Sequence, residues 1–155
     1  MAGCSSPELE TAHQQDVARS RAMSLPVDYR DIAYVVLKDM LADPQIVNLR
    51  HRYFVSIFGR DLERDLRNRL AAEGIEAFPG STYVESLEIR GSAEGEVFYR
   101  NMEIHILSIE PDRDDTYRVR HGYHCGDLCG GSFDSYVKFE AGMWQVSRTD
   151  LRWIS

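Results

Sequence analysis

The chain has 155 residues, of which 43% are hydrophobic and 28% are charged. This length suits one domain with one core, and the composition is that of a globular protein rather than a disordered chain. Because the net charge is −7 and the basic residues are scattered, we expect no nucleic acid partner, which would require clustered positive charge.

The chain opens with Met1-Ala2-Gly3-Cys4-Ser5-Ser6. This segment resembles the end of a bacterial lipoprotein signal, with Met1 where leucine is usual. The resemblance implies that Cys4 carries lipid and that the polar residues 1–24 form a flexible tether before a single domain at 25–155. It predicts the cell envelope or periplasm as the location, with the membrane reached only through Cys4. Without lipid on Cys4, the chain would be cytoplasmic and this segment an ordinary frayed terminus.

The first regular pattern predicts an amphipathic helix from Asp28 to Leu41, with Asp28 as its N-cap. Its apolar positions follow helical spacing: Tyr29, Ile32, Ala33, Val36, Leu37, Met40 and Leu41. Residues 52–58 alternate with apolar side chains on both faces, as in a buried strand. Leucines at four-residue spacing then predict a second helix over 61–73, which Gly74 ends: Leu62, Leu66 and Leu70.

The rest of the chain consists of strand-like runs, most of them separated by short polar or glycine-rich turns. The runs are Tyr83–Ile89, Glu96–Arg100, Met102–Ile109, Thr116–Cys125, Ser132–Phe139 and Met143–Ser147. Such runs and turns are typical of an antiparallel meander. Helices followed by strands predict an α+β fold, with the helices packed on one face of a curved antiparallel sheet. In the last hairpin, Trp144 is expected in the core.

The order of these elements resembles the nuclear transport factor two-like, or cystatin-like, superfamily. Two motifs strengthen the likeness to members known as uncharacterised bacterial lipoproteins: Tyr123-x-Cys-Gly-x-Leu-Cys-Gly-Gly and Phe139-Glu-Ala-Gly-Met-Trp144-Gln-Val146. The resemblance covers residues 28–150 and implies a cone-shaped α+β fold, with a pocket between the concave sheet and the helices. Many members have three helices where this sequence predicts two. The resemblance implies no particular activity.

Two of the three cysteines, Cys125 and Cys129, lie in one glycine-rich turn. If Cys4 carries lipid, this pair lies in an oxidising compartment and is expected to form a disulfide. In a reducing cytoplasm the same pair, with His121 and His124, would instead suggest a metal site. Strand alternation places His121 and His124 on opposite faces, which favours the disulfide over the metal.

The superfamily pocket would be lined by His121, Tyr123 and Tyr136, which we expect to bind a ligand. Glu103 and Asp134 are strand carboxylates that could reach His121 in a catalytic pair. The sequence has no nucleophile elbow, no phosphate-binding glycine loop before a helix and no His-Glu-x-x-His motif. We therefore assign no catalytic residue, metal ligand or cofactor.

The preferred hypothesis is a non-catalytic, envelope-associated binding domain for a small molecule or a protein partner. One alternative is a pocket enzyme of the isomerase, dehydratase or hydrolase type that uses His121 and a carboxylate. Another is an immunity-like inhibitor, whose acidic surface would meet a basic partner.

Overall fold

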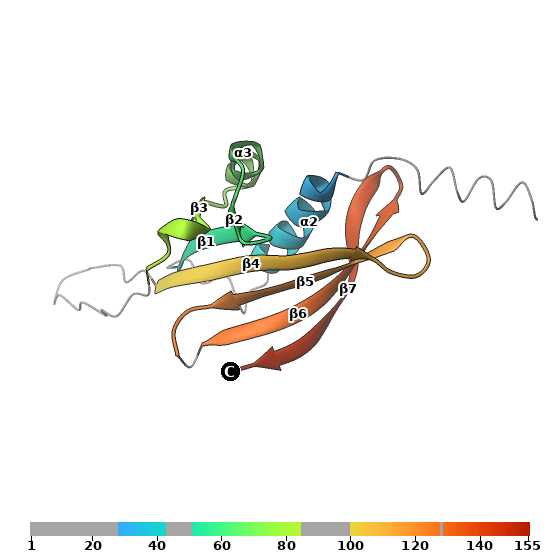
Figure 1. Cartoon of the computed structure of the whole chain (residues 1–155). Coiled ribbons are helices and arrows are strands. Elements are labelled where there is room, and N and C mark those ends of the chain that lie inside the picture. Colours follow the sequence, from blue (N-terminus) through green and yellow to red (C-terminus); the bar gives the residue numbers. More distant parts are fainter. Residues whose placement is uncertain (1–27, 43–50, 85–99, 128) are drawn as a thin grey trace, which may run out of the picture.

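The first helix of the computed structural model, α2, spans Tyr29–Ala42 (Figure 1). The structure describes residues 28–42, 51–84, 100–127 and 129–155. Asp28 caps the helix as predicted, because its Oδ1 accepts a hydrogen bond from the backbone N of Arg30 at 2.9 Å. Tyr29 is 46% exposed, whereas the other six residues of the predicted stripe are buried along one side of the helix: Ile32, Ala33, Val36, Leu37, Met40 and Leu41. Among the described residues, no helix is long and apolar enough to span a membrane.

A compact unit of short elements follows α2. It contains β1 (His51–Ile57), β2 (Arg60–Asp61), α3 (Arg64–Ala72), β3 (Ala77–Pro79) and the 3-10 turn η1 (Gly80–Thr82). The second helix is shorter than predicted, because Asp61 belongs to β2. It ends as expected at Gly74, whose φ of +79° lies in the left-handed region. The backbone N–H groups of Gly74 and Ile75 bond the carbonyls of Ala71 and Leu70 at 3.0 Å.

Four long strands complete the sheet: β4 (Arg100–Pro111), β5 (Thr116–His124), β6 (Gly130–Glu140) and β7 (Met143–Ile154). The strand order is β2-β1-β4-β5-β6-β7, with β3 also paired to β1. Residues 85–89 and 96–99 of the predicted strands lie outside the described residues. The predicted break at Asn101 is wrong, because β4 continues through it.

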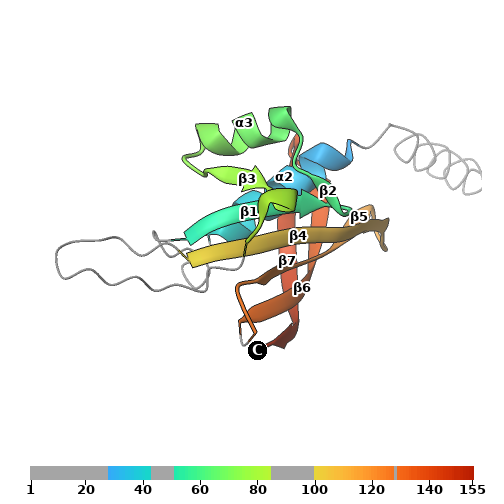
Figure 2. The same cartoon turned by 60° about the vertical axis from the view of Figure 1, so that its left-hand side comes forward.

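The architecture is α+β as predicted, but the sheet is mixed rather than wholly antiparallel. Strands β4 to β7 pair antiparallel, whereas β1 pairs parallel with both β3 and β4. Parallel pairing needs a crossover between the strands. Helix α3 lies between β1 and β3 in the chain and provides part of that crossover. The sheet twists strongly, so that β6 and β7 run across the direction of β4 in the second view (Figure 2).

The sheet has an inner side, which faces the helices, and an outer side. Buried strand residues on the inner side form one apolar cluster with the buried residues of α2 and with Leu66 and Leu70 of α3. The strand residues are Val55, Ile104, Ile106, Val119 and Val137. Cross-strand partners share a face of the sheet, so the register shows whether a strand residue lies on the inner or the outer side. His121 lies opposite Phe133 on the inner side, and Arg118 lies opposite Tyr136 on the outer side. Burial of this cluster is the main stabilising term of the fold.

Candidate functional site

The β6–β7 hairpin extends beside the N-terminal half of α2 and ends in a tight turn. Glu140 pairs with Met143, and the two residues between them, Ala141 and Gly142, have φ values of +50° and +81°. Two consecutive positive φ values are those of a type I′ turn, which matches the twist of the flanking strands. The turn brings Phe139 opposite Trp144, and their rings meet edge to face at 5.2 Å.

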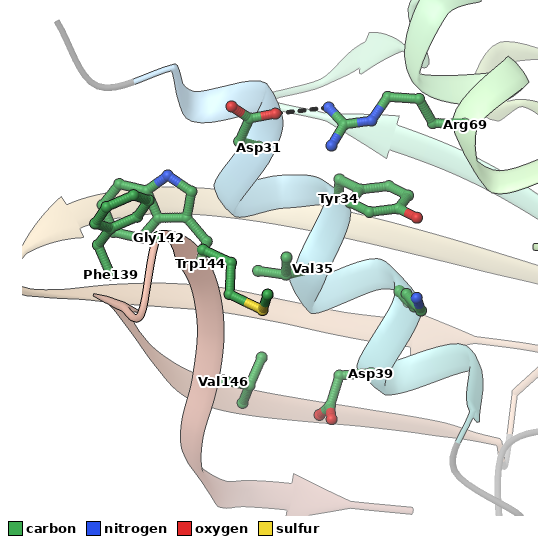
Figure 3. Close-up of a pocket in the computed structure, with 11 residues that line it drawn as sticks. Asp31, Tyr34, Val35, Asp39, Arg69, Phe139, Gly142, Trp144 and Val146 are labelled. Atoms are coloured by element: carbon green, nitrogen blue, oxygen red, sulfur yellow. Dashed lines mark hydrogen bonds and ion pairs between the residues drawn. The ribbon is translucent and has the colours of Figure 1, made fainter.

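A groove of about 560 Å³ separates this hairpin from α2 (Figure 3). Its hairpin wall is apolar: Phe139, Gly142, Met143, Trp144 and Val146. Its helix wall is mostly polar and comes from α2 and α3: Asp31, Tyr34, Val35, Lys38, Asp39 and Arg69. Phe139 and Met143 are each 57% exposed, although both are large apolar side chains. The groove therefore presents an apolar wall to solvent opposite a polar one.

Ion pairs between α2 and α3 hold the polar wall in place. Oδ1 of Asp31 lies 2.7 Å from Nη1 of Arg69. The guanidinium carbon of Arg69 lies 4.1 Å from the ring centroid of Tyr34. Lys38 pairs with Glu73 at 3.0 Å, and the hydroxyl of Tyr34 donates to the same carboxylate at 2.9 Å. These contacts bridge the two helices beside the groove.

The same contacts shift three pKa values. The hydrogen bonds from Lys38 and then Tyr34 lower the pKa of Glu73, and the bond to Glu73 raises the pKa of Lys38. Desolvation, followed by the bond to Glu73, raises the pKa of Tyr34. All three groups keep their ordinary charge near neutral pH. The wall thus offers fixed charges and a neutral phenol, an arrangement suited to binding rather than to proton transfer.

The aromatic contacts continue from the groove toward the start of α2. Trp144 meets Tyr117 edge to face at 5.6 Å, and Tyr117 meets Tyr29 at 6.5 Å. Trp144 is half-buried beside the core, so its predicted core position is only partly right. Sequence reasoning missed the groove, because the aromatic residues flanking the Ala141–Gly142 turn resemble ordinary strand positions.

The structure brings together two of the three predicted pocket residues. Phe133 stacks on both His121 and Tyr123, with centroid distances of 5.6 and 6.2 Å, on the inner side. Tyr136 lies on the outer side, opposite Arg118 and beneath the guanidinium of Arg148 at 4.1 Å. The predicted set is therefore divided between the two sides of the sheet. His121 and Tyr123 are not among the residues that line the groove.

His121 is buried and belongs to a chain of hydrogen bonds. Its Nε2 lies 2.8 Å from the hydroxyl of Ser135, which lies 2.8 Å from that of Thr149. Its Nδ1 has no hydrogen-bond partner among the described residues. Burial lowers the pKa of His121 to about 4, opposed by Asp134 and reinforced by His105. His121 is therefore neutral at physiological pH.

The carboxylates considered for a catalytic pair lie on the other side of the sheet. Glu103 pairs in register with His124, and Asp134 with Arg120, which places both on the outer side. Neither makes the hydrogen bond to Nε2 of His121, which is made by Ser135. The pair that the enzyme alternative requires is not assembled by these residues.

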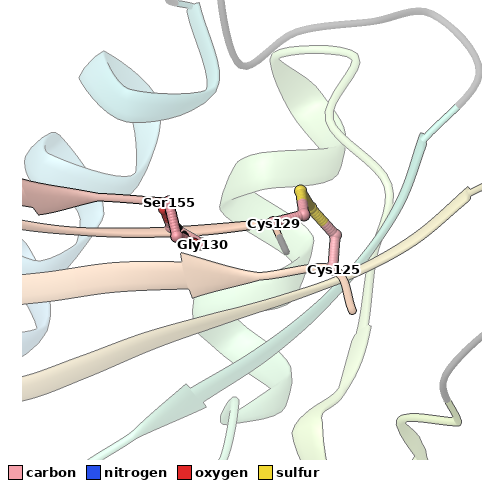
Figure 4. The surroundings of a disulfide bond; sticks show 4 residues. All are labelled: Cys125, Cys129, Gly130 and Ser155. Atoms are coloured by element: carbon pink, nitrogen blue, oxygen red, sulfur yellow. Dashed lines mark hydrogen bonds between the residues drawn. A yellow bond between two sulfur atoms is a disulfide. The ribbon is translucent and has the colours of Figure 1, made fainter. Parts of the chain in front are cut away.

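Cys125 and Cys129 are joined in a disulfide, with Cα atoms 5.1 Å apart (Figure 4). The backbone N of Cys125 also donates to the carbonyl of Cys129 at 2.9 Å. Beside them, the backbone N of Ser155 donates to the carbonyl of Gly130 at 2.9 Å. The disulfide occupies both sulfurs that the metal alternative needs. Among the described residues, no three His, Cys, Asp or Glu side chains group to hold a metal.

Comparison of the chain with protein-family models, curated proteins and solved structures finds no match. The fold and the groove thus define an α+β protein with an open mixed sheet and an amphipathic surface groove.

Proposed function

We propose that this chain is a non-catalytic binding domain of the cell envelope, whose groove between α2 and the β6–β7 hairpin binds a segment of a protein partner. The observation that carries the proposal is the exposure of Phe139 and Met143 beside Trp144 on one wall of that groove. Aromatic residues, Met and Arg are enriched where proteins bind one another.

The shape and charge of the groove favour a particular kind of segment. The groove is open along the surface, which suits a peptide better than an enclosed small molecule. The chain carries a net charge of −7, and the groove is lined by Asp31 and Asp39. Around the groove three carboxylates, those of Asp31, Asp39 and Glu73, outnumber the two cations, Lys38 and Arg69. A segment with apolar and positively charged side chains is therefore the best match.

Location and anchoring form part of the proposal. The resemblance of the first residues to a lipoprotein signal supports lipid at Cys4, a tether over residues 1–24 and an exported domain at 25–155. The disulfide between Cys125 and Cys129 agrees with an oxidising compartment. The helices beside a twisted sheet agree with a cystatin-like cone, which we propose as the finer fold class.

A fluorescence titration tests the groove directly. The chain has two tryptophans, so Trp153→Phe leaves Trp144 as the reporter at the groove. The probes are short synthetic peptides that combine Lys or Arg with Trp, Phe or Leu, and matched peptides with Asp or Glu instead. We expect saturable changes in Trp144 emission with the basic peptides and weaker binding of the acidic ones.

Variants in the reporter background locate the binding. Phe139→Ser and Met143→Ser should each lower the affinity for the peptide about tenfold, as expected for exposed apolar residues at an interface centre. The control is Leu107→Ser, because Leu107 is 53% exposed but does not line the groove. The proposal fails if no peptide binds, or if Leu107→Ser weakens binding as much as the groove variants do. Saturable binding of small aromatic compounds without any peptide binding would overturn the choice of a protein partner.

A further inference from the structure

Four arginines lie on the outer side of the sheet on two strands, β5 and β7, that flank β6. Arg118 and Arg120 come from β5, and Arg148 and Arg152 from β7. The register places Arg118 opposite Tyr136 and Arg120 opposite Asp134, with Arg148 and Asp150 as the β7 partners of those β6 residues. Arginines of β5 and β7 thus converge over β6, the strand between them.

One carboxylate holds two of these arginines side by side. Arg120 Nε donates to Oδ1 of Asp134 at 3.2 Å, and Arg152 Nη1 donates to Oδ2 at 3.1 Å. The Asp134 side chain is only 12% exposed, whereas those of Arg120 and Arg152 are 36% and 41% exposed. The largely buried carboxylate of Asp134 therefore holds two partly exposed guanidiniums in place.

The remaining pairs leave this cluster one negative charge short. Arg118 pairs with Glu110 at 2.8 Å, and Arg148 pairs with Asp150 at 3.1 Å. Four guanidiniums thus face three carboxylates, and Asp134 is the one that is shared. Two guanidiniums on one carboxylate repel each other, and a further anion between them would relieve that repulsion.

Most hydrogen-bond donors of the arginine pair make no hydrogen bond to Asp134. A guanidinium has five N–H donors in a planar fork, which matches the oxygens of phosphate or carboxylate in pairs. Arg120 bonds Asp134 through Nε, so its two terminal nitrogens have no partner among the described residues. Arg152 bonds Asp134 through Nη1, so its Nε and Nη2 likewise have no partner among the described residues.

We propose that Arg120 and Arg152, fixed by Asp134, form a binding site for a phosphate group on the outer side of the sheet. The phosphate accepts hydrogen bonds from both guanidiniums and supplies the missing negative charge. Arg118 and Arg148 flank the site, each paired with its own carboxylate, so the excess positive charge lies on Arg120 and Arg152. The site lies on the opposite side of the sheet from the groove lining at Trp144 and Val146, which pair with the inner residues Phe139 and Val137. It is therefore independent of the proposed peptide binding.

The test is an NMR titration of the full chain with inorganic phosphate and pyrophosphate, following the arginine Nε–Hε signals. We expect saturable shifts of the Arg120 and Arg152 signals, with pyrophosphate binding more tightly because its charge is higher. Arg120→Lys with Arg152→Lys keeps the charge and the pairing to Asp134 but removes the fork. This variant should bind phosphate about tenfold more weakly.

Arg64→Lys with Arg67→Lys on α3 is the matched control, and its affinity should stay unchanged. Thermal unfolding of each variant shows that the fold is retained. The proposal is overturned if phosphate does not shift the two signals, or if the α3 control loses as much affinity as the Arg120 and Arg152 variant.

A second arm identifies the source of the phosphate. Vesicles of phosphatidylglycerol are compared with vesicles of phosphatidylcholine in a sedimentation assay. Binding to the anionic vesicles that the Arg120 and Arg152 variant loses assigns the site to a lipid headgroup. Shifts with dissolved phosphates, without binding to either vesicle, assign it to a free phosphate compound.

Discussion

The two sides of the sheet differ in the residues they carry and in the interactions these residues make. Along β6, Phe133, Ser135 and Val137 face the helices, while the alternate positions Asp134 and Tyr136 face outward among arginines. The inner apolar positions gain stability by leaving water, whereas on the outer side Asp134 pairs with Arg120 and Arg152 and Tyr136 lies beneath the guanidinium of Arg148. Stability therefore resides on the inner side, and the two proposed binding sites lie on the outer side and at the hairpin beside α2.

The largest effect should follow from a cavity on the inner side. Ile104 is fully buried in β4, so Ile104→Ala should lower the free energy of unfolding by about 2–5 kcal/mol, measured by urea denaturation. Leu107→Ala on the same strand, at a 53% exposed position, should cost less than about 1 kcal/mol. Equal losses at the two positions would contradict the division between the sides.

The buried histidine should make stability fall at acid pH. Its folded pKa is about 4, below the unfolded value of about 6.5, so the unfolded chain binds the proton first as pH drops. The contribution of neutral His121 to the free energy of unfolding is complete above about pH 7 and should be lost between pH 7 and pH 4. The loss is on the order of 2–3 kcal/mol.

Urea unfolding of the wild type and of His121→Gln over this pH range checks the prediction. The variant should show a flatter profile whatever its stability at neutral pH. Burial also lowers the pKa of His105, so a smaller slope of the same sign should remain. Identical profiles would show that His121 is not buried in its neutral form.

Reduction of the disulfide should have a smaller effect. The bond joins two residues that are only four positions apart. For so short a loop, the reduced entropy of the unfolded chain stabilises the fold by about 2 kcal/mol at most. Intact mass with and without reductant should show one bond between Cys125 and Cys129, and urea unfolding should show the loss on reduction. Free thiols with stoichiometric zinc would instead support the metal alternative.

The smallest effect should come from an exposed pair on the outer side. Arg118 and Glu110 are 38% and 52% exposed, and such pairs contribute about 0–1 kcal/mol. A double-mutant cycle with Arg118→Gln and Glu110→Gln should give a coupling within this range. A coupling well above it would mean that the outer side also stabilises the fold.

Periodicity was enough to predict the elements with a regular pattern of apolar side chains. The α2 stripe and the alternation in β1 and β5 set these boundaries to within about one residue, because burial selects the residue type at each turn or pleat. Alternation does not reveal the direction of a strand. The parallel pairing of β1 with β4 depends on the crossover and could not be predicted from either strand alone.

The candidate sites show a second limit of sequence reasoning. His121 and Tyr136 lie on different strands, and whether they share a face depends on the register, which the intervening turn sets. The pairing of His121 with Phe133 places Tyr136 on the other side. The groove likewise depends on how far the hairpin extends beside α2, and no local pattern records this distance.

The position of β1 between β3 and β4 has a consequence for how the chain folds. Strands β4 to β7 join neighbours in sequence through short turns, whereas β1 ends at residue 57 and must find β4, which begins at residue 100. Closing this long loop costs entropy before any contact compensates for it. We expect the meander to form in the transition state and β1 to dock afterwards. In stopped-flow kinetics, Val119→Ala in β5 should then slow folding, while Val55→Ala in β1 should mainly accelerate unfolding.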